Sequence, residues 1–189
     1  MDKKARQQKW FVLSAFVLLA ALSRLLPHPP NFTPIGSMAL FGAAYFSRKY
    51  LAFLVPILAF WVSDLVLNNV VYAEYFESFS WFSTDLMWSC VAMALIVVLG
   101  RFFLKKVSIT TVLGSSLVAS IVFFVFSNFG VWASGAMYSM DLGGLMAAFA
   151  AGIPFFGNTV VGNLFYSAVL FGGFEALKYQ LPYLQKQVS

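Results

Sequence analysis

The sequence predicts an all-α integral membrane protein, and both its composition and the placement of its charges point to that class. Of the 189 residues, 61% are hydrophobic and 10% are charged, whereas soluble domains carry about 25% charged residues. The chain therefore lacks the polar surface that a soluble enzyme needs. Its one cysteine, Cys90, excludes an intrachain disulfide and a paired-cysteine metal site. We expect a single integral membrane domain over residues 1–189.

Six apolar segments are candidates for transmembrane helices, which need about 20 residues each. They cover residues 10–26, 34–46, 51–67, 86–104, 111–133 and 154–177. Prolines directly after residue 26 end the first segment, and Thr33 and Pro34 form a typical helix start for the second. Because the second segment rises only about 20 Å, it either does not span alone or is extended by the turn before it.

The last apolar stretch, residues 142–177, is too long for one crossing and too short for two crossings with a loop. Gly152, Pro154 and Gly157 lie in its middle. Both residue types weaken helices. We therefore expect an interfacial or re-entrant piece at 142–151, followed by the sixth span at 154–177.

The basic residues predict the topology, because cytoplasmic loops of membrane proteins are enriched in Lys and Arg. Six crossings with both termini inside place all basic residues except Arg24 on the cytoplasmic side. These are Lys3, Lys4, Arg6, Lys9, Arg48, Lys49, Arg101, Lys105, Lys106, Lys178 and Lys186. The opposite loops contain Glu74, Glu77, Asp85 and Asp141. Topology thus accounts for the basic N-terminal cluster, and we expect no nucleic-acid partner.

Polar and aromatic side chains within or beside the spans gather near their outer ends. They are Arg24, His28, Trp61, Asp64, Asn68, Asn128, Trp132, Asn158 and Asn163. Ionisable and amide groups inside a membrane are costly and usually functional. Aromatic surfaces with a few polar groups are typical of small-ligand pockets. We therefore predict an outward-facing pocket for a small molecule.

Within this pocket we expect Asp64, Asn128 and Asn158 to form hydrogen bonds, and Trp61 and Trp132 to stack on the ligand. Arg24 or His28 would lie near its mouth.

Each of these side chains also has a purely structural interpretation. Arg24 and Asp64 would then form an ion pair between two helices, and His28 would be a loop residue. The tryptophans would belong to the aromatic belt at the membrane interface. Cys90 would be an inert buried thiol.

Sequence motifs of energised or hydrolytic chemistry are absent. The chain contains no Walker A motif, no H-E-x-x-H and no G-x-S-x-G. We therefore expect no enzyme activity, no resident cofactor or metal, and no capacity to drive transport with ATP unaided.

Four strings of residues resemble segments of a group of bacterial membrane proteins related to S components. S components are the substrate-binding subunits of energy-coupling factor (ECF) vitamin transporters. The strings cover residues 24–36, 63–65, 127–132 and 153–159 continuing to 170–173. The resemblance implies an S-component-like bundle of six helices in a bacterial inner membrane, with cytoplasmic N and C termini. It also implies uptake of a vitamin or its precursor.

The same resemblance implies an ECF coupling subunit and cytosolic ATPases as partners. Many S components dock on the coupling subunit through an Ala-x-x-x-Ala motif in helix one, and residues 14–21 lack that spacing. Two alternatives therefore stay open. One is a solitary cobalamin-type S component in which Cys90 ligates cobalt, and the other is a non-transporting accessory or structural subunit of a membrane complex.

Overall fold

The structure, a computed structural model, describes residues 3–75 and 78–185, and its regular elements there are all helical. The main helices are α1 (Lys3–Leu22), α2 (Ile35–Tyr45), α3 (Lys49–Val66), α4 (Thr84–Phe103), α5 (Ile109–Ala133), α6 (Leu142–Ser167), α7 (Gly173–Gln180) and α8 (Pro182–Gln185). Short 3₁₀ or π turns follow α1 (η1, Ser23–Leu25), α3 (η2, Leu67–Val71; η3, Ala73–Tyr75) and α6 (η4, Ala168–Gly172). The all-α prediction is confirmed, while Glu77 and Lys186 lie outside the described residues.

Within the described residues, five helical segments are long and apolar enough to cross a bilayer, namely Lys3–Leu25, Lys49–Val71, Leu86–Phe103, Ile109–Ala133 and Leu142–Gln180. The helix α2 is apolar but shorter. Large apolar side chains point outward from the bundle, as Ile109 does with 82% of its surface exposed. These features are consistent with a multi-pass membrane protein. The count of six crossings and their orientation stay predictions.

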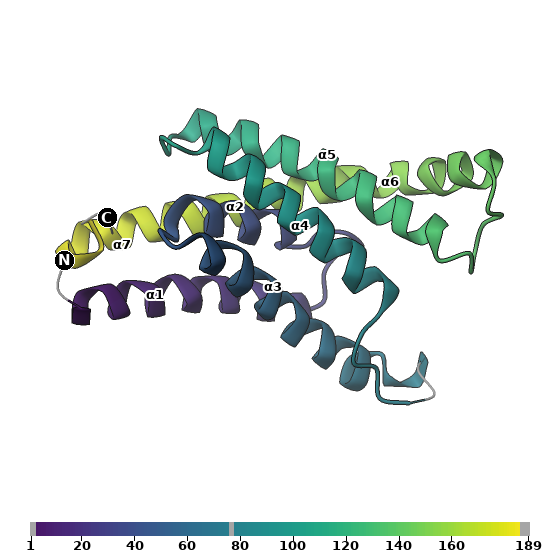
Figure 1. Cartoon of the computed structure of the whole chain (residues 1–189), viewed down its shortest axis with the longest axis horizontal. Helices are drawn as coiled ribbons and strands as arrows, with labels where there is room; N and C mark the ends of the chain where they lie inside the picture. Colours follow the sequence, from purple (N-terminus) through teal and green to yellow (C-terminus); the bar gives the residue numbers. More distant parts are fainter. Residues whose placement is uncertain (1–2, 76–77, 186–189) are drawn as a thin grey trace.

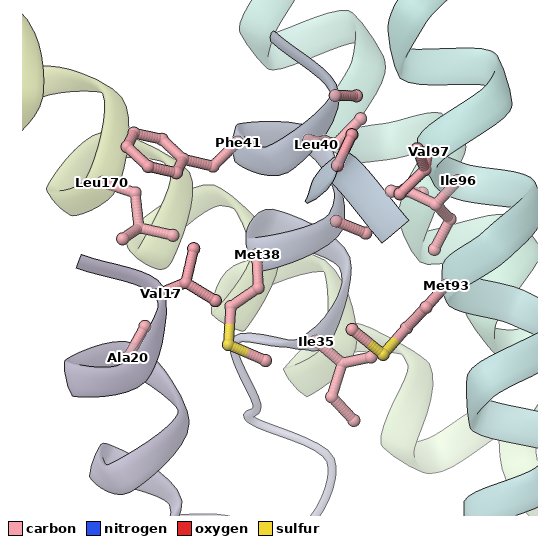
Figure 2. Packing of buried hydrophobic residues seen from close by; sticks show 14 of the residues in the cluster. Val17, Ala20, Ile35, Met38, Leu40, Phe41, Met93, Ile96, Val97 and Leu170 are labelled. Carbon is pink, nitrogen blue, oxygen red and sulfur yellow. The ribbon is translucent and has the colours of Figure 1, made fainter. Parts of the chain in front are cut away.

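The short helix α2 lies at the centre of the bundle, where it contacts α1, α3, α4, α5 and α6. Its residues from Ile35 to Ala43 are all buried, as expected for a helix that is apolar on every side. In Figure 2, Met38 points toward α1, Leu40 faces α4, and Phe41 lies beside Leu170. Small residues allow this close packing, since a Cβ at Gly42 would lie 2.8 Å from the Ala52 carbonyl oxygen.

The pieces expected at 142–151 and 154–177 are not separate, because α6 runs without interruption from the first into the second and continues through η4 into α7. An interfacial or re-entrant position of residues 142–151 stays a prediction. Asp141 caps its start by accepting a hydrogen bond from the Gly144 amide at 2.7 Å. Pro154 is exposed, so its ring lies away from the packed face and costs the helix only local hydrogen bonding. Gly152 faces α5, where a Cβ would meet the Asn128 amide.

Both chain ends lie at the same end of the bundle, here called the termini end (Figure 1). The Lys9 ammonium donates a hydrogen bond of 2.9 Å to the Leu184 carbonyl, which joins α1 to α8. Arg101 Nη2 donates to the Phe46 carbonyl at 3.2 Å, which joins α4 to the turn after α2. The opposite half of the bundle, called the far end, contains the ends of α1 and α3, which continue into η1 and η2, and its tip is formed by the loop between α5 and α6.

Candidate functional site

A largely buried ion pair at the far end connects the end of α1 to α3. Arg24 Nη2 lies 3.3 Å from Asp64 Oδ1, and the two side chains are only 10% and 14% exposed. The other terminal nitrogen of Arg24 donates to Ser63 Oγ at 2.6 Å and to the Phe60 carbonyl at 3.4 Å. The guanidinium also lies 4.3 Å from the centre of the Phe60 ring. Arg24 is thus held by charge, hydrogen bonds and a cation–π contact together.

The second carboxylate oxygen of Asp64 extends this network to α4. It accepts hydrogen bonds from Asn68 Nδ2 at 3.2 Å and from Ser83 Oγ at 3.3 Å. Ser83 is also the N-cap of α4, since its hydroxyl accepts from the Leu86 amide at 3.1 Å. Asp64 therefore holds together the ends of three helices.

Two aromatic side chains form a wall beside this network. The indole N–H of Trp61 donates to the Trp81 carbonyl at 3.0 Å, which fixes the ring. The ring stacks against Phe82 with centroids 6.0 Å apart and planes at 16°. Trp61, Asp64 and Asn68 thus lie close to one another along α3 and η2.

Two cavities flank the Asp64 network. The larger measures about 490 Å³ and is lined by Ile57, Leu58, Trp61, Phe82, Ser83, Leu86, Met87 and Cys90. The smaller measures about 190 Å³ and is lined by Asn68, Asn69, Ala73, Ser78 and Phe79. Asp64 accepts hydrogen bonds from one lining residue of each cavity, Ser83 and Asn68. A ligand in the larger cavity would meet a flat aromatic wall, a hydroxyl and a thiol.

Asn163 lies in a different place, deep between α2, α5 and α6, where it is only 2% exposed. Its side-chain Nδ2 donates to Ser120 Oγ at 2.9 Å, and its backbone carbonyl accepts from Ser37 Oγ at 2.8 Å. Ser167 Oγ extends the cluster by donating to Ser37 at 3.2 Å, and it lies 2.8 Å from Ser116 Oγ. Asn163 thus lines neither far-end cavity, and its partners are the hydroxyls of neighbouring helices.

The remaining predicted site residues make local contacts at the far end. Asn128 Nδ2 donates to the Phe124 carbonyl of its own helix at 2.8 Å, and Trp132 Nε1 donates to the Ser139 carbonyl at 3.0 Å. Asn158 Nδ2 donates to the Pro30 carbonyl at 2.9 Å, which ties α6 to the loop after α1. His28 is exposed, with Nδ1 lying 2.9 Å from the Pro29 carbonyl oxygen. The structure therefore brings together Arg24, Trp61, Asp64 and Asn68. The other four residues, Asn128, Trp132, Asn158 and His28, lie apart from them.

Sequence reasoning missed Phe82 and Ser83, which line the larger cavity, and Asn69. The Asn69 amide bonds twice to Ser80, with Nδ2 donating to its carbonyl at 3.0 Å and Oδ1 accepting from its amide at 2.7 Å. A signal for Ser83 exists, because a serine shortly before an apolar helix is a typical N-cap. No comparable signal marks Phe82 in a chain with 22 phenylalanines.

No group of three or more His, Cys, Asp or Glu side chains that would suit a metal ion occurs within the described part of the chain. Cys90 is a free thiol that lines the larger cavity.

Comparison with known proteins identifies the family but not an activity. No curated protein matches the chain, and no solved structure matches it. A sequence profile described as a family of unknown function, DUF6580, matches residues 4–184, which is nearly the whole chain. The protein therefore belongs to the family of unknown function DUF6580.

Proposed function

We propose that this protein is a substrate-binding membrane subunit for the uptake of a small nutrient such as a vitamin or its precursor. In this proposal it lies in a bacterial inner membrane with both termini in the cytosol, and the far end faces outward. The observation that carries the proposal is the 490 Å³ cavity between α3 and α4, walled by Trp61 and Phe82 beside the buried Asp64 network. Small-ligand pockets are commonly of about this size and composition.

The lining defines the class of ligand. Trp61 is fixed by its bond to the Trp81 carbonyl and offers a flat face for stacking. Ser83 is the polar lining group closest to Asp64, to which its hydroxyl donates at 3.3 Å. Because Arg24 offsets the charge of Asp64, the site presents hydrogen-bonding groups rather than a net negative charge. The ligand that fits best is a neutral, flat, largely apolar ring with one polar edge.

Uptake would need energy from partner subunits, such as an ECF coupling subunit with its ATPases, because the chain lacks a Walker A motif. The cavities beside Asp64 argue against the purely structural alternative, in which the polar residues of the far end would be packed without space. An accessory subunit would need no such cavity.

The test is to purify the protein in lipid nanodiscs without added ligand and to extract and identify bound small molecules by mass spectrometry. The parent and Phe11→Ala, an exposed aromatic on α1, are expected to carry the same compound. Trp61→Ala is expected to reduce the amount of bound compound at least about fivefold, because stacking of a flat ring on an aromatic side chain contributes on the order of 1–3 kcal/mol. A parent without any bound compound, or full retention by Trp61→Ala, would overturn the proposal.

Cys90 supports a second candidate, a cobalamin-type S component, because its thiol lines the same cavity. A corrinoid ligated by this thiol would show a visible absorption spectrum that changes in Cys90→Ser. If added cobalamin binds neither the parent nor the variant, or if the two spectra are identical, the cobalt ligand is not Cys90.

A further inference from the structure

The termini end contains a cavity of about 630 Å³ that is lined by an unusual concentration of positive charge. Five cationic side chains border it, namely Lys9, Arg101, Lys105, Lys106 and Lys178. They come from α1, from the end of α4 and the turn after it, and from α7, so the fold gathers them from three distant parts of the chain. Among the described lining residues only Glu175 is acidic.

Glu175 is already engaged within the cavity wall. It accepts a hydrogen bond of 2.6 Å from the Tyr45 hydroxyl, and Lys178 Nζ donates to both of its oxygens at 2.9 Å. The ion pairs found in the described residues do not include Arg101, Lys105 or Lys106. Arg101 instead donates to the neutral carbonyls of Phe46 and Ser47, and Lys105 lies over the Phe102 ring. The wall therefore keeps an excess of positive charge.

Membrane topology alone does not require this arrangement. A positive bias needs only basic residues in the cytoplasmic loops, and the exposed Lys3, Lys4 and Lys49 satisfy it without lining the cavity. Gathering like charges around one concavity is electrostatically unfavourable. A bound anion would offset this cost.

We infer that this cavity, here called the basic cavity, is a binding site for a phosphate group. Lysine binds phosphate as a point charge and arginine as a two-pronged donor, and the cavity offers both. The exposed Phe102 and Phe103 on the adjacent α4 turn place the cavity at the edge of the apolar surface. Phosphate at that level has two sources, the headgroup of an anionic lipid and a soluble phosphate compound. Basic pockets between transmembrane helices bind lipid headgroups in this way.

The test uses the detergent-purified full chain and native mass spectrometry. The lipid probes are phosphatidylglycerol and phosphatidylcholine with identical acyl chains, and the soluble probe is glycerol 3-phosphate. The test variant is Lys105→Gln/Lys106→Gln, and the matched control is Lys3→Gln/Lys4→Gln, which removes the same charge from the same end. All four lysines are exposed, so both variants are expected to fold.

The parent and the control are expected to bind a phosphate probe equally, and the test variant to bind it roughly 10- to 30-fold more weakly, from two lysines near the surface. Preference for phosphatidylglycerol that glycerol 3-phosphate does not reduce identifies a lipid headgroup. Direct binding of glycerol 3-phosphate identifies a soluble compound. The inference is overturned if the parent binds neither probe above the phosphatidylcholine level, or if the control loses as much binding as the test variant. Neither result affects the far-end cavity, which Trp61→Ala tests separately.

Discussion

Neutralising Asp64 is expected to destabilise the bundle strongly, because it leaves the Arg24 guanidinium buried without its counter-charge. The two side chains are 10% and 14% exposed and lie 3.3 Å apart. Removing one partner of a buried ion pair costs about 3–5 kcal/mol. We expect Asp64→Asn to fall near the lower value, about 3 kcal/mol, because Ser63 and the Phe60 carbonyl still accept hydrogen bonds from Arg24.

The measurement is the free energy of unfolding in mixed micelles titrated with a denaturing detergent, for the parent, both single variants and the double variant. Arg24→Gln/Asp64→Asn is expected to be more stable than the sum of the single losses predicts, since neither charge remains buried alone. The exposed Glu74→Gln is the control for a carboxylate-to-amide change at the same end. Loss below about 0.5 kcal/mol in Asp64→Asn, or strict additivity in the cycle, would refute the reasoning.

Three further predictions concern the packing and capping of α2 and α6. Gly36→Ala is expected to cost about 1–3 kcal/mol of unfolding free energy, because its Cβ would lie 2.6 Å from Asn163 Oδ1; Gly114→Ala, with no atom within 4 Å, is the control and should not destabilise. Asn163→Leu is expected to lower the free energy of unfolding by about 1–2 kcal/mol in the same assay, since Ser120 Oγ loses its hydrogen bond to the amide. Unchanged stability would contradict a stabilising role for the hydrogen bonds between Asn163 and the neighbouring serines. The amide of Gly144 and the hydroxyl of Ser139 hold the pKa of Asp141 below its ordinary value, so the capped first turn of α6 is protected at neutral pH and loses protection as the pH falls through that lowered pKa. Hydrogen exchange of the Gly144 amide measures this loss, and exchange that does not change with acidification in a pH-corrected series would argue against the cap.

Much of the helix layout follows from local signals in the sequence. Apolar segments bounded by charges or prolines correspond to α1, α3, α4 and α5, and the pair Asp64 and Asn68 lies together because residues four apart share a helix face. The central place of α2 is also indicated by its uninterrupted apolar character. These features depend on a few neighbouring residues, and for that reason they were predictable.

The errors and omissions concern contacts between distant helices. Pro154 and Gly152 look like helix breakers in isolation, yet the proline is exposed and the glycine packs against Asn128, so α6 stays continuous. Asn163 has the same chemistry as a ligand-binding amide, but serines from two other helices satisfy it.

The basic cavity was missed because each of its lysines and its arginine has a sufficient explanation in topology. Only the tertiary structure, which brings residues of α1, α4 and α7 to the lining of one cavity, shows that these charges surround one space.

The most direct test of the central claim, that the Asp64 network faces outward and the basic cavity faces the cytosol, is labelling with a membrane-impermeant maleimide. Because Cys90 is the only cysteine in the chain, a Cys90→Ser background allows single cysteines to be placed by Glu74→Cys and Lys105→Cys, both at exposed positions. We expect Glu74→Cys to be labelled in spheroplasts, and Lys105→Cys only after the inner membrane is opened. Labelling of both positions from the same side would contradict the topology and the outward-facing site with it.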